Sequence, residues 1–519
     1  MSIRSNTPHI RHLLAAALLL PLLTACSFMS EDYYDCDKEP PTTTSPEKYI
    51  NLSIVVSAGN ENTTRADEKP AGGEDGDGRE AGSERENKVT GITLMLYQDQ
   101  DGKGINTADD NTKIDFIRYF PVTEDIKRED ADTGNPKEKK DEVVYTTGDQ
   151  SIGSSLDFTT TYHVIVVANQ NLENKYTVGS RVTKIREDVT SSIYKGTGIG
   201  VDATEFVMAL EEDCEIDFKG IKPKSEGNKL IYTVTNPIRI ERLAARIDFW
   251  MKGAKYRTKE NDPAYEKMPG YEYNVTKSDG TLSNDKFVLT AVTPFNLYDE
   301  SEFYIKHVNP SKDGKVQYLD PETTTSYVID PKTDKKEVVS LSVGLQYKNP
   351  LSELVKASTA EDMAIAAGGW RRTTEKLREG TSLFVTFDDN VDNEDNFILC
   401  YPKENTLKLS SPLYYYATGV AIEGYYYKDG QGTGEYRVYY GFLRHQGEGS
   451  SGTYDINTKE DFEDNENAPV GDKDTPMNFS VVRNNIYRIY IHKITEQGEI
   501  ELKIIVKEWD KFTHDMIYM

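Results

Sequence analysis

The stretch Ser480-Val-Val-Arg-Asn-Asn-Ile-Tyr-Arg-Ile-Tyr-Ile-His-Lys493 decides the fold class, because its side chains alternate as they do in a β-strand. A polar turn around Gly498 follows, and a second strand is predicted at residues 500–509. The chain then ends with Asp510-Lys-Phe-Thr-His-Asp-Met-Ile-Tyr-Met519, which is strand-like to its last residue. An apolar terminal strand without a partner would be an exposed sheet edge, and such edges promote aggregation. We therefore expect residues 512–519 to pair with another segment, either of this chain or of another molecule.

The N-terminus has the features of a lipoprotein export signal. Two arginines precede an apolar run at residues 13–23, and Leu23-Thr-Ala-Cys26 closes that run as a lipobox does. The run is too short to span a membrane and is typical of a processed signal. We expect residues 1–25 to be removed and Cys26 to carry two or more acyl chains, palmitate among them, which suffices for stable anchoring. The sequence thus predicts an outer-membrane lipoprotein precursor that contacts the membrane through lipid alone.

Composition favours a secreted β-rich protein. The 519 residues allow two or three domains, and the 33 tyrosines outnumber the 17 phenylalanines and 3 tryptophans. A formal charge of −26 argues against nucleic acid or an anionic membrane surface as a partner. The other cysteines, Cys36, Cys214 and Cys400, form no disulfide framework or metal-binding motif that spacing would indicate.

A strand near the front of the chain precedes a polar loop. Tyr49-Ile-Asn-Leu-Ser-Ile-Val-Val-Ser57 alternates cleanly, which predicts a half-buried strand. The residues predicted to share its buried face are Ile50, Leu52, Ile54 and Val56. Residues 58–87 contain almost no apolar side chain, so we expect a disordered or loop segment. Three arginines in it are predicted to be accessible to a trypsin-like protease, namely Arg65, Arg79 and Arg85.

The rest of the chain reads as many short strands with turn residues between them. Further strands are predicted at residues 89–97, 114–120, 162–168, 230–234, 238–250, 287–293, 382–387, 397–401, 424–427 and 436–443. The one predicted helix spans residues 351–367 and stops at Gly368. This pattern favours an all-β fold built of β-sandwiches with few short helices. We expect a propeptide at 26–65, an N-terminal sandwich at 66–237 and a C-terminal sandwich at 238–519.

Four features together resemble the fimbrillins of Bacteroidales, especially the shaft subunit of short (minor) fimbriae, a type V pilus. First, the lipobox precedes an alternating strand and a loop that contains Thr64-Arg65-Ala66. Second, Ile240-Glu-Arg-Leu-Ala-Ala-Arg246 is similar to a strand at that family's inter-domain junction. Third, Val438-Tyr-Tyr-Gly-Phe-Leu443 and Val481-Val-Arg-Asn-Asn-Ile-Tyr487 resemble its C-terminal pair of strands. Fourth, Trp509 lies ten residues before the terminus.

The resemblance implies two transthyretin-like sandwich domains in tandem and assembly by a protease-triggered strand exchange. An Arg-specific protease would cut between Arg65 and Ala66 and release the lipidated peptide together with strand 49–57. Residues 512–519 of another subunit would then fill the vacated site. Because the loop also holds Arg79 and Arg85, the cleavage site stays open among the three arginines.

The residues support the same exchange independently of the family. Both strands alternate, and only one of them can fill a given site between two sheet edges. By parity, the side chains of the last strand that we expect to point inward are Phe512, His514, Met516 and Tyr518. Burying three or four such side chains is worth on the order of 6–10 kcal/mol before ordering costs. A head-to-tail contact of this kind does not close on itself, so it yields a filament.

No catalytic, metal or cofactor site is predicted. Residues 99–104 begin like a calcium loop, but Lys103 stands where a ligand oxygen belongs. Residues 388–395 are acidic without the spacing of a calcium site, and the seven histidines form no zinc motif. The tyrosine triplets at 414–416 and 425–427 fit strand packing better than sugar stacking, and Arg483-Asn-Asn485 fits a turn.

The favoured function is therefore a non-enzymatic, adhesive shaft subunit that polymerises with itself in an extracellular fimbrium. Expected partners are accessory, tip and anchor subunits and a receptor on a host or bacterial surface. One alternative is a fimbrial anchor or accessory/tip lipoprotein that keeps its lipid. A second alternative is a surface glycan-binding lipoprotein.

Overall fold

The computed structural model describes most of the chain between Pro46 and Asp510, and these residues belong to one compact unit. The described residues are 46–56, 79–98, 111–128, 141–153, 156–186, 188–210, 214–299, 302–304, 309–310, 316–317, 347–379, 383–385, 394–405, 417–443, 481 and 483–510. The predicted signal peptide, Cys26, the Arg65–Ala66 bond and residues 512–519 lie outside them and stay predictions.

Two sheets share the first hydrophobic core. The larger has the order β5 (Ile114–Pro121), β4 (Gly91–Tyr97), β9 (Thr161–Ala168), β11 (Met208–Leu210), β15 (Ile238–Arg242), β2 (Ser53–Val56), β7 (Asp141–Thr146) and β6 (Thr123–Arg128), with β12 (Cys214–Asp217) beside β9. The smaller has the order β13 (Lys224–Glu226), β14 (Lys229–Thr233), β1 (Glu47–Asn51) and β8 (Gln150–Ser151). Strand β9 is a continuous apolar run because it lies inside the larger sheet, where both of its faces are buried.

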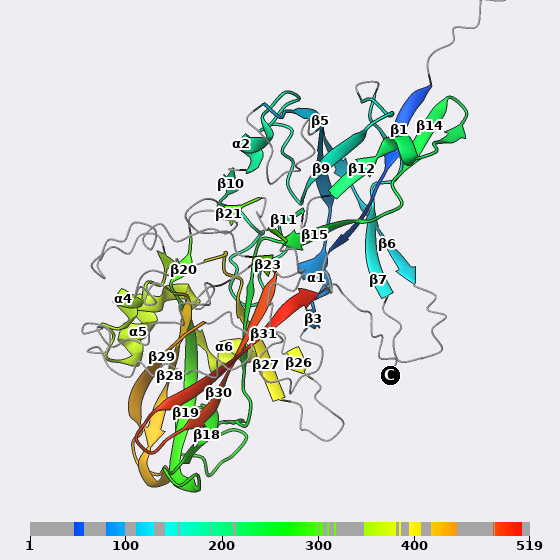
Figure 1. The fold of residues 1–519 in the computed structure, drawn as a ribbon. Coiled ribbons are helices and arrows are strands. Elements are labelled where there is room, and N and C mark those ends of the chain that lie inside the picture. Colours follow the sequence, from blue (N-terminus) through cyan, green and yellow to red (C-terminus); the bar gives the residue numbers. More distant parts are fainter. Residues whose placement is uncertain are drawn as a thin grey trace, which may run out of the picture. The chain divides into compact units, whose positions relative to one another are not determined.

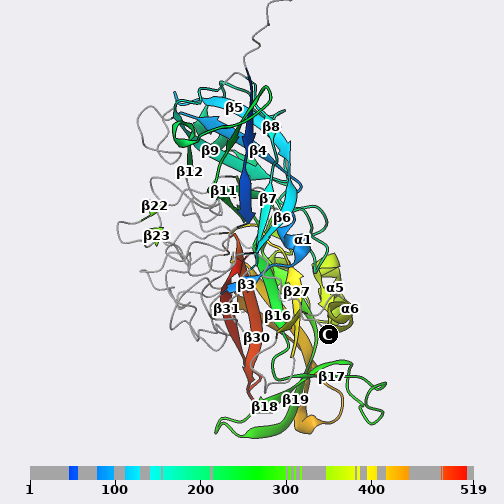
Figure 2. The same ribbon diagram turned by 90° about the vertical axis from the view of Figure 1, so that its right-hand side faces the viewer.

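Two more sheets share the second core. One has the order β26 (Leu383–Val385), β27 (Glu394–Cys400), β16 (Arg246–Trp250), β30 (Asn485–Ile494), β31 (Ile500–Asp510) and β3 (Arg79–Ala81). The other has the order β17 (Lys255–Arg257), β18 (Gly270–Thr276), β19 (Leu282–Phe295), β28 (Gly419–Tyr427) and β29 (Glu435–Phe442), with β25 (Arg372–Thr373) beside β19. Strands β30 and β31, in red, lie side by side in both views (Figures 1 and 2).

The remaining elements are short. The helices are α1 (Glu84–Asn87), α2 (Val182–Arg186), α4 (Leu351–Leu354), α5 (Ala360–Ala367) and α6 (Thr374–Glu379), with 3₁₀ turns at Phe218–Gly220, Gly368–Trp370 and Lys428–Gly430. Two-residue strand pairs are β10 (Val189–Thr190) with β21 (Glu302–Phe303), β20 (Leu297–Tyr298) with β24 (Tyr347–Lys348), and β22 (Asn309–Pro310) with β23 (Val316–Gln317). The all-β class with few short helices is confirmed.

The chain passes from the first core to the second within three residues. Strand β15 pairs with β11 and β2 in the first large sheet, whereas β16 pairs with β27 and β30 in the second. The buried residues of the first core come from the chain up to Ala244, apart from four that come later in the sequence. Those of the second core begin at Ala245. The predicted division at residue 238 stays a prediction, but β15 pairs with strands that precede that position.

Four local predictions need correction. The strand predicted at residues 238–250 is two strands, β15 and β16, which lie in different sheets. The strand expected from residue 480 begins at Asn485, because Arg483 and Asn484 form a turn in which Asn484 has a φ of 57°. The predicted helix 351–367 is two helices, since Thr359 caps a new one; Gly368, with a φ of 52°, ends it as expected. The loop prediction for residues 58–87 is wrong at its end, where β3 and α1 are ordered.

A glycine on β28 tests how tightly the second core is packed. A Cβ added at Gly424 would lie 2.4 Å from the Val288 carbonyl oxygen and 2.4 Å from the Phe287 ring. We expect Gly424→Ala to lower the free energy of unfolding by about 1–3 kcal/mol, because the backbone cannot move away cheaply. Gly369→Ala, whose nearest neighbour would be 4.0 Å away, is the matched control. Urea unfolding of both variants is the measurement, and equal midpoints would contradict this packing.

Candidate functional site

Residues 47–56 form a strand that is paired on both sides. Strand β1 lies between β14, which is parallel to it, and β8, which is antiparallel. Strand β2 lies between β15, again parallel, and β7, again antiparallel. We refer to residues 47–56 as the N-terminal strand, to β14 and β15 as the parallel flank, and to β7 and β8 as the antiparallel flank. Figure 1 shows β1, in blue, beside β14 in green.

The four side chains predicted to point inward from this strand are buried in the first hydrophobic core. Ile50, Leu52 and Ile54 are fully buried, and Val56 is 2% exposed. Tyr49, Asn51 and Ser53, which alternate with them, are half-buried. The period of two predicted from the sequence is therefore the period of burial. Whether these four side chains are ever displaced stays a prediction.

The strand changes sheet at Leu52 without losing backbone partners. The Leu52 N–H donates to the Thr147 hydroxyl at 3.0 Å, and the Thr147 N–H donates to the Leu52 carbonyl oxygen at 3.1 Å. On the other side, the Val234 N–H donates to the Asn51 carbonyl oxygen at 2.9 Å. Removing the strand would leave two rows of unpaired backbone groups and an apolar gap, both of which are costly in a buried site.

The next described segment, residues 79–87, is held by the second set of sheets. Strand β3 runs parallel to β31, with Arg79 opposite Glu508. Helix α1 follows, and the N–H and hydroxyl of Ser83 donate to the Glu86 carboxylate at 2.6 and 2.8 Å. The Arg85 guanidinium donates to the Tyr401 hydroxyl oxygen at 3.1 Å. Because proteolysis favours exposed loop tips, a helical Arg85 and a strand-paired Arg79 are poorer cleavage sites than the sequence indicated.

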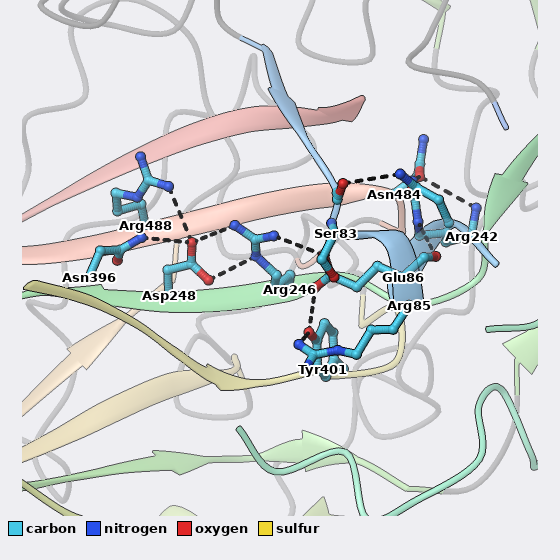
Figure 3. Close-up of polar contacts among 12 residues, drawn as sticks. Ser83, Arg85, Glu86, Arg242, Arg246, Asp248, Asn396, Tyr401, Asn484 and Arg488 are labelled. Atoms are coloured by element: carbon cyan, nitrogen blue, oxygen red, sulfur yellow. Dashed lines mark hydrogen bonds and ion pairs between the residues drawn. The ribbon is translucent and has the colours of Figure 1, made fainter. Parts of the chain in front are cut away.

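A chain of buried charges anchors α1 (Figure 3). The Glu86 carboxylate accepts a short hydrogen bond from Tyr401 and lies 3.4 Å from a guanidinium nitrogen of Arg246. Arg246 in turn donates two hydrogen bonds to Asp248, at 2.9 and 2.8 Å. A carboxylate oxygen of Asp248 also lies 3.3 Å from a guanidinium nitrogen of Arg488, on β30. Every charged group in this chain is at most 1% exposed, so each depends on its neighbours for compensation.

The surroundings fix the protonation of Glu86. Burial alone would raise the pKa of its carboxyl group. The positive charge of Arg246 and the hydrogen bonds from Tyr401 and Ser83 outweigh burial and lower that pKa. Burial, together with the Glu86 charge, raises the pKa of Tyr401 well above its ordinary value, so Tyr401 stays a donor. Glu86 is thus a carboxylate held ionised inside the protein.

The sequence reasoning missed Glu86 and Asn87, since it placed both in a disordered loop. A signal was present: Ser83 and Glu86 have the spacing of a helix-capping box. The predicted turn is present at Arg483 and Asn484, just before β30 begins, and the Asn484 amide oxygen accepts from Arg242 at 2.9 Å. Tyr425–Tyr427 lie in β28, where Tyr426 and Tyr427 are buried.

Metal ligands, apolar helices and cysteines can each be followed in the described part of the chain. No three histidine, cysteine or acidic side chains there gather in a way that could hold a metal ion. Among the same residues, none of the helices has the length and apolar character needed to cross a membrane. Cys214 and Cys400 form no disulfide there, and burial raises the pKa of the Cys400 thiol. The two acidic loops considered for calcium lie mainly outside these ranges.

Comparison with known proteins gives structural likeness only. No protein-family model matches the chain, and no curated protein matches it. A candidate cell adhesion protein from Parabacteroides distasonis has a similar structure, with 9% identity, a TM-score of 0.40, and coverage of 90% of this chain and 98% of that one. The C-terminally truncated tip fimbrial protein Mfa3 from Porphyromonas gingivalis is also similar. It has 9% identity and a TM-score of 0.35, and the match covers 89% of this chain and 100% of that one. The fimbrilin FimA from Porphyromonas gingivalis has 14% identity and a TM-score of 0.32, and the match covers 90% of this chain and 99% of that one. At this identity and TM-score, these likenesses assign no function.

The charge on Glu86 makes stability depend on pH. A carboxylate whose pKa is lower in the folded chain than in the unfolded chain stabilises the fold at neutral pH, and this contribution is lost as the pH falls through the folded value. We expect Glu86→Gln to cost about 2–4 kcal/mol at pH 7, because Arg246 loses a buried charge partner. The gap from wild type should narrow below about pH 4, where an unfolded glutamate is protonated.

Urea unfolding of both chains from pH 7 to pH 3 measures this gap. Glu84→Gln, an exposed acid on the same helix, is the control and should track wild type throughout. A Glu86→Gln deficit that stays constant over the whole range would contradict the role of the charge.

Proposed function

We propose that this chain is a structural subunit of a surface fimbria, exported as a lipoprotein precursor and polymerised by donor-strand exchange after cleavage by an Arg-specific protease. In this proposal the N-terminal strand is temporary, and residues 512–519 of another copy replace it. The mature subunit acts in adhesion as part of a fibre and has no catalytic residues. The lipid on Cys26 holds only the precursor at the outer membrane.

One observation carries the proposal: the N-terminal strand is central in its sheets yet is connected to the rest of the fold only through residues 57–78. The next described element, β3, pairs with β31 in a different sheet. A single cut in that segment would therefore convert a central strand into a separate peptide, held only by non-covalent contacts such as its backbone hydrogen bonds and four buried side chains. Because the next element lies in another sheet, a cut would release the strand without dividing any described element, which supports a strand that can be exchanged.

The proposed replacement matches the vacancy in number and spacing. The N-terminal strand buries four side chains at alternate positions, from Ile50 to Val56. The last eight residues carry four side chains at the same spacing, from Phe512 to Tyr518. Strand addition of this kind satisfies the backbone of both flanks, while alternate side chains fill pockets. Because donor and acceptor lie at different places on each copy, the contact propagates head to tail.

Other subunits complete the proposed fibre. A filament grown this way exposes an unfilled acceptor at one end and an unused donor at the other. Accessory, tip and anchor subunits are the partners that such ends require, and a receptor on a host or bacterial surface would be bound by the assembled fibre. A chain that kept its N-terminal strand and lipid would serve as an anchor instead.

Limited proteolysis tests the proposal. We expect trypsin treatment of the full-length chain to produce a new N-terminus at Ala66, followed by ladders that resist SDS. Deleting residues 512–519 should abolish the ladders and leave a folded, cleavable monomer. Arg65→Ala should leave the chain uncut at that position and monomeric, whereas Arg79→Ala is the matched control and should assemble normally.

Two results would contradict the proposal. Polymerisation of the chain that lacks residues 512–519 would show that these residues are not the donor. Ladders formed by Arg65→Ala with its N-terminal strand still attached would show that no strand has to leave.

A further inference from the structure

We propose that α1 is a strut that holds the parallel and antiparallel flanks apart while the N-terminal strand is absent. This inference rests on the proposed strand exchange and adds a positioning role for residues of the mature chain. Adjacent strands are about 4.8 Å apart, so flanks on either side of one strand lie roughly 10 Å apart. Once that strand leaves, two unpaired edges would tend to pair with each other and close the site.

Helix α1 bonds to the parallel flank through Arg242, the last residue of β15. The Arg242 Nε donates to the Glu86 carbonyl oxygen at 3.1 Å, and its guanidinium also makes a short hydrogen bond to the Asn87 side-chain oxygen. Arg242 is fully buried and donates a further bond to Asn484, at 2.9 Å. A guanidinium fork that spans three acceptors fixes the position of the helix relative to β15.

Helix α1 bonds to the antiparallel flank through Tyr145 of β7. The Tyr145 hydroxyl donates to the Asn87 carbonyl oxygen at 2.8 Å, and the side chain is 3% exposed. Tyr145 lies directly opposite Ile54 of β2, and Ile54 lies opposite Ile238 of β15. The two attachments of α1 are therefore on strands that β2 separates, and they connect those strands by a route that does not pass through β2.

The strut keeps its place without the N-terminal strand. Its Glu86 carboxylate is bound by Arg246 and Tyr401, which belong to or follow strands of the second pair of sheets (Figure 3). Neither of these partners is in the N-terminal strand. Helix α1 also lies downstream of Arg65, so a cut there leaves it in the mature chain.

The same geometry restricts where a productive cut can fall. A cut after Arg85 would divide α1 itself and separate Ser83 from the carboxylate to which it donates. It would also leave Glu86 as a new terminus with a charged amino group in a buried site, which is costly. The strut thus favours cleavage in residues 57–78, upstream of β3.

A conservative tyrosine substitution tests the strut. The chain would lack residues 512–519 so that it cannot polymerise, and trypsin would cut it. Uptake of a fluorescent peptide copy of residues 511–519 would then be followed by anisotropy. We expect Tyr145→Phe to be cut at the wild-type rate but to take up the peptide at least tenfold more slowly. Arg242→Lys, which keeps the charge but loses the fork, should show the same defect.

Tyr162→Phe is the matched control. Tyr162 is a buried tyrosine of the same large sheet whose hydroxyl oxygen accepts from the Asp157 N–H at 3.1 Å, away from α1. Its peptide uptake should equal that of wild type. Uptake by Tyr145→Phe and Arg242→Lys at the wild-type rate would overturn the strut while leaving strand exchange intact. Failure of the wild-type chain to take up the peptide would instead overturn the proposed function, and the strut with it.

Discussion

Residues 47–56 are hydrogen-bonded along both edges, and the arrangement of the first two sheets depends on this pairing. A central strand completes two rows of backbone pairing and contributes a buried face, so its sheets cannot leave the position vacant at low cost. Here that strand comes from the front of the chain and lies parallel to residues 229–240, which follow much later in the sequence. Parallel pairing of this kind needs no hairpin connection to its neighbours, and any extended segment with the right alternation could supply it.

The buried charges between the two cores have a different effect, because they hold α1 in one fixed position. Arg242 and Arg246 lie on either side of the short passage between the two cores, and each bonds to α1. An ion network of this type adds little net stability compared with an apolar core, but misplacing any member leaves a charge uncompensated. Helix α1 is therefore held in one place, whereas residues 47–56 are joined to the described elements that follow them only through residues 57–78. In the proposed exchange, the strand that leaves and the helix that stays are therefore close together in the sequence.

Much of this could be predicted from the sequence, and the limits have physical causes. The alternation of residues 49–57 indicated which side chains are buried, because period-two burial is a local property. Its parallel partners could not be foreseen, since register between segments almost two hundred residues apart leaves no local trace. Glu86 was missed because a polar, charged segment resembles a loop unless its partners are known, and those partners are Arg246 and Tyr401 on other strands. The start of β30 was predicted too early because Asn484 has a positive φ, which ends strand geometry there. Its side chain accepts a hydrogen bond from Arg242, a partner far away in the sequence.

Hydrogen exchange at the flanks is the most direct test of the central claim. The amides of β14 and β7 would be followed in the intact chain, in the cut chain stripped of its N-terminal strand, and in the polymer. Strand exchange predicts slow hydrogen exchange in the intact chain, fast exchange in the stripped chain, and slow exchange again in the polymer. Flanks that remain protected after the strand has gone, or that stay unprotected in the polymer, would contradict it.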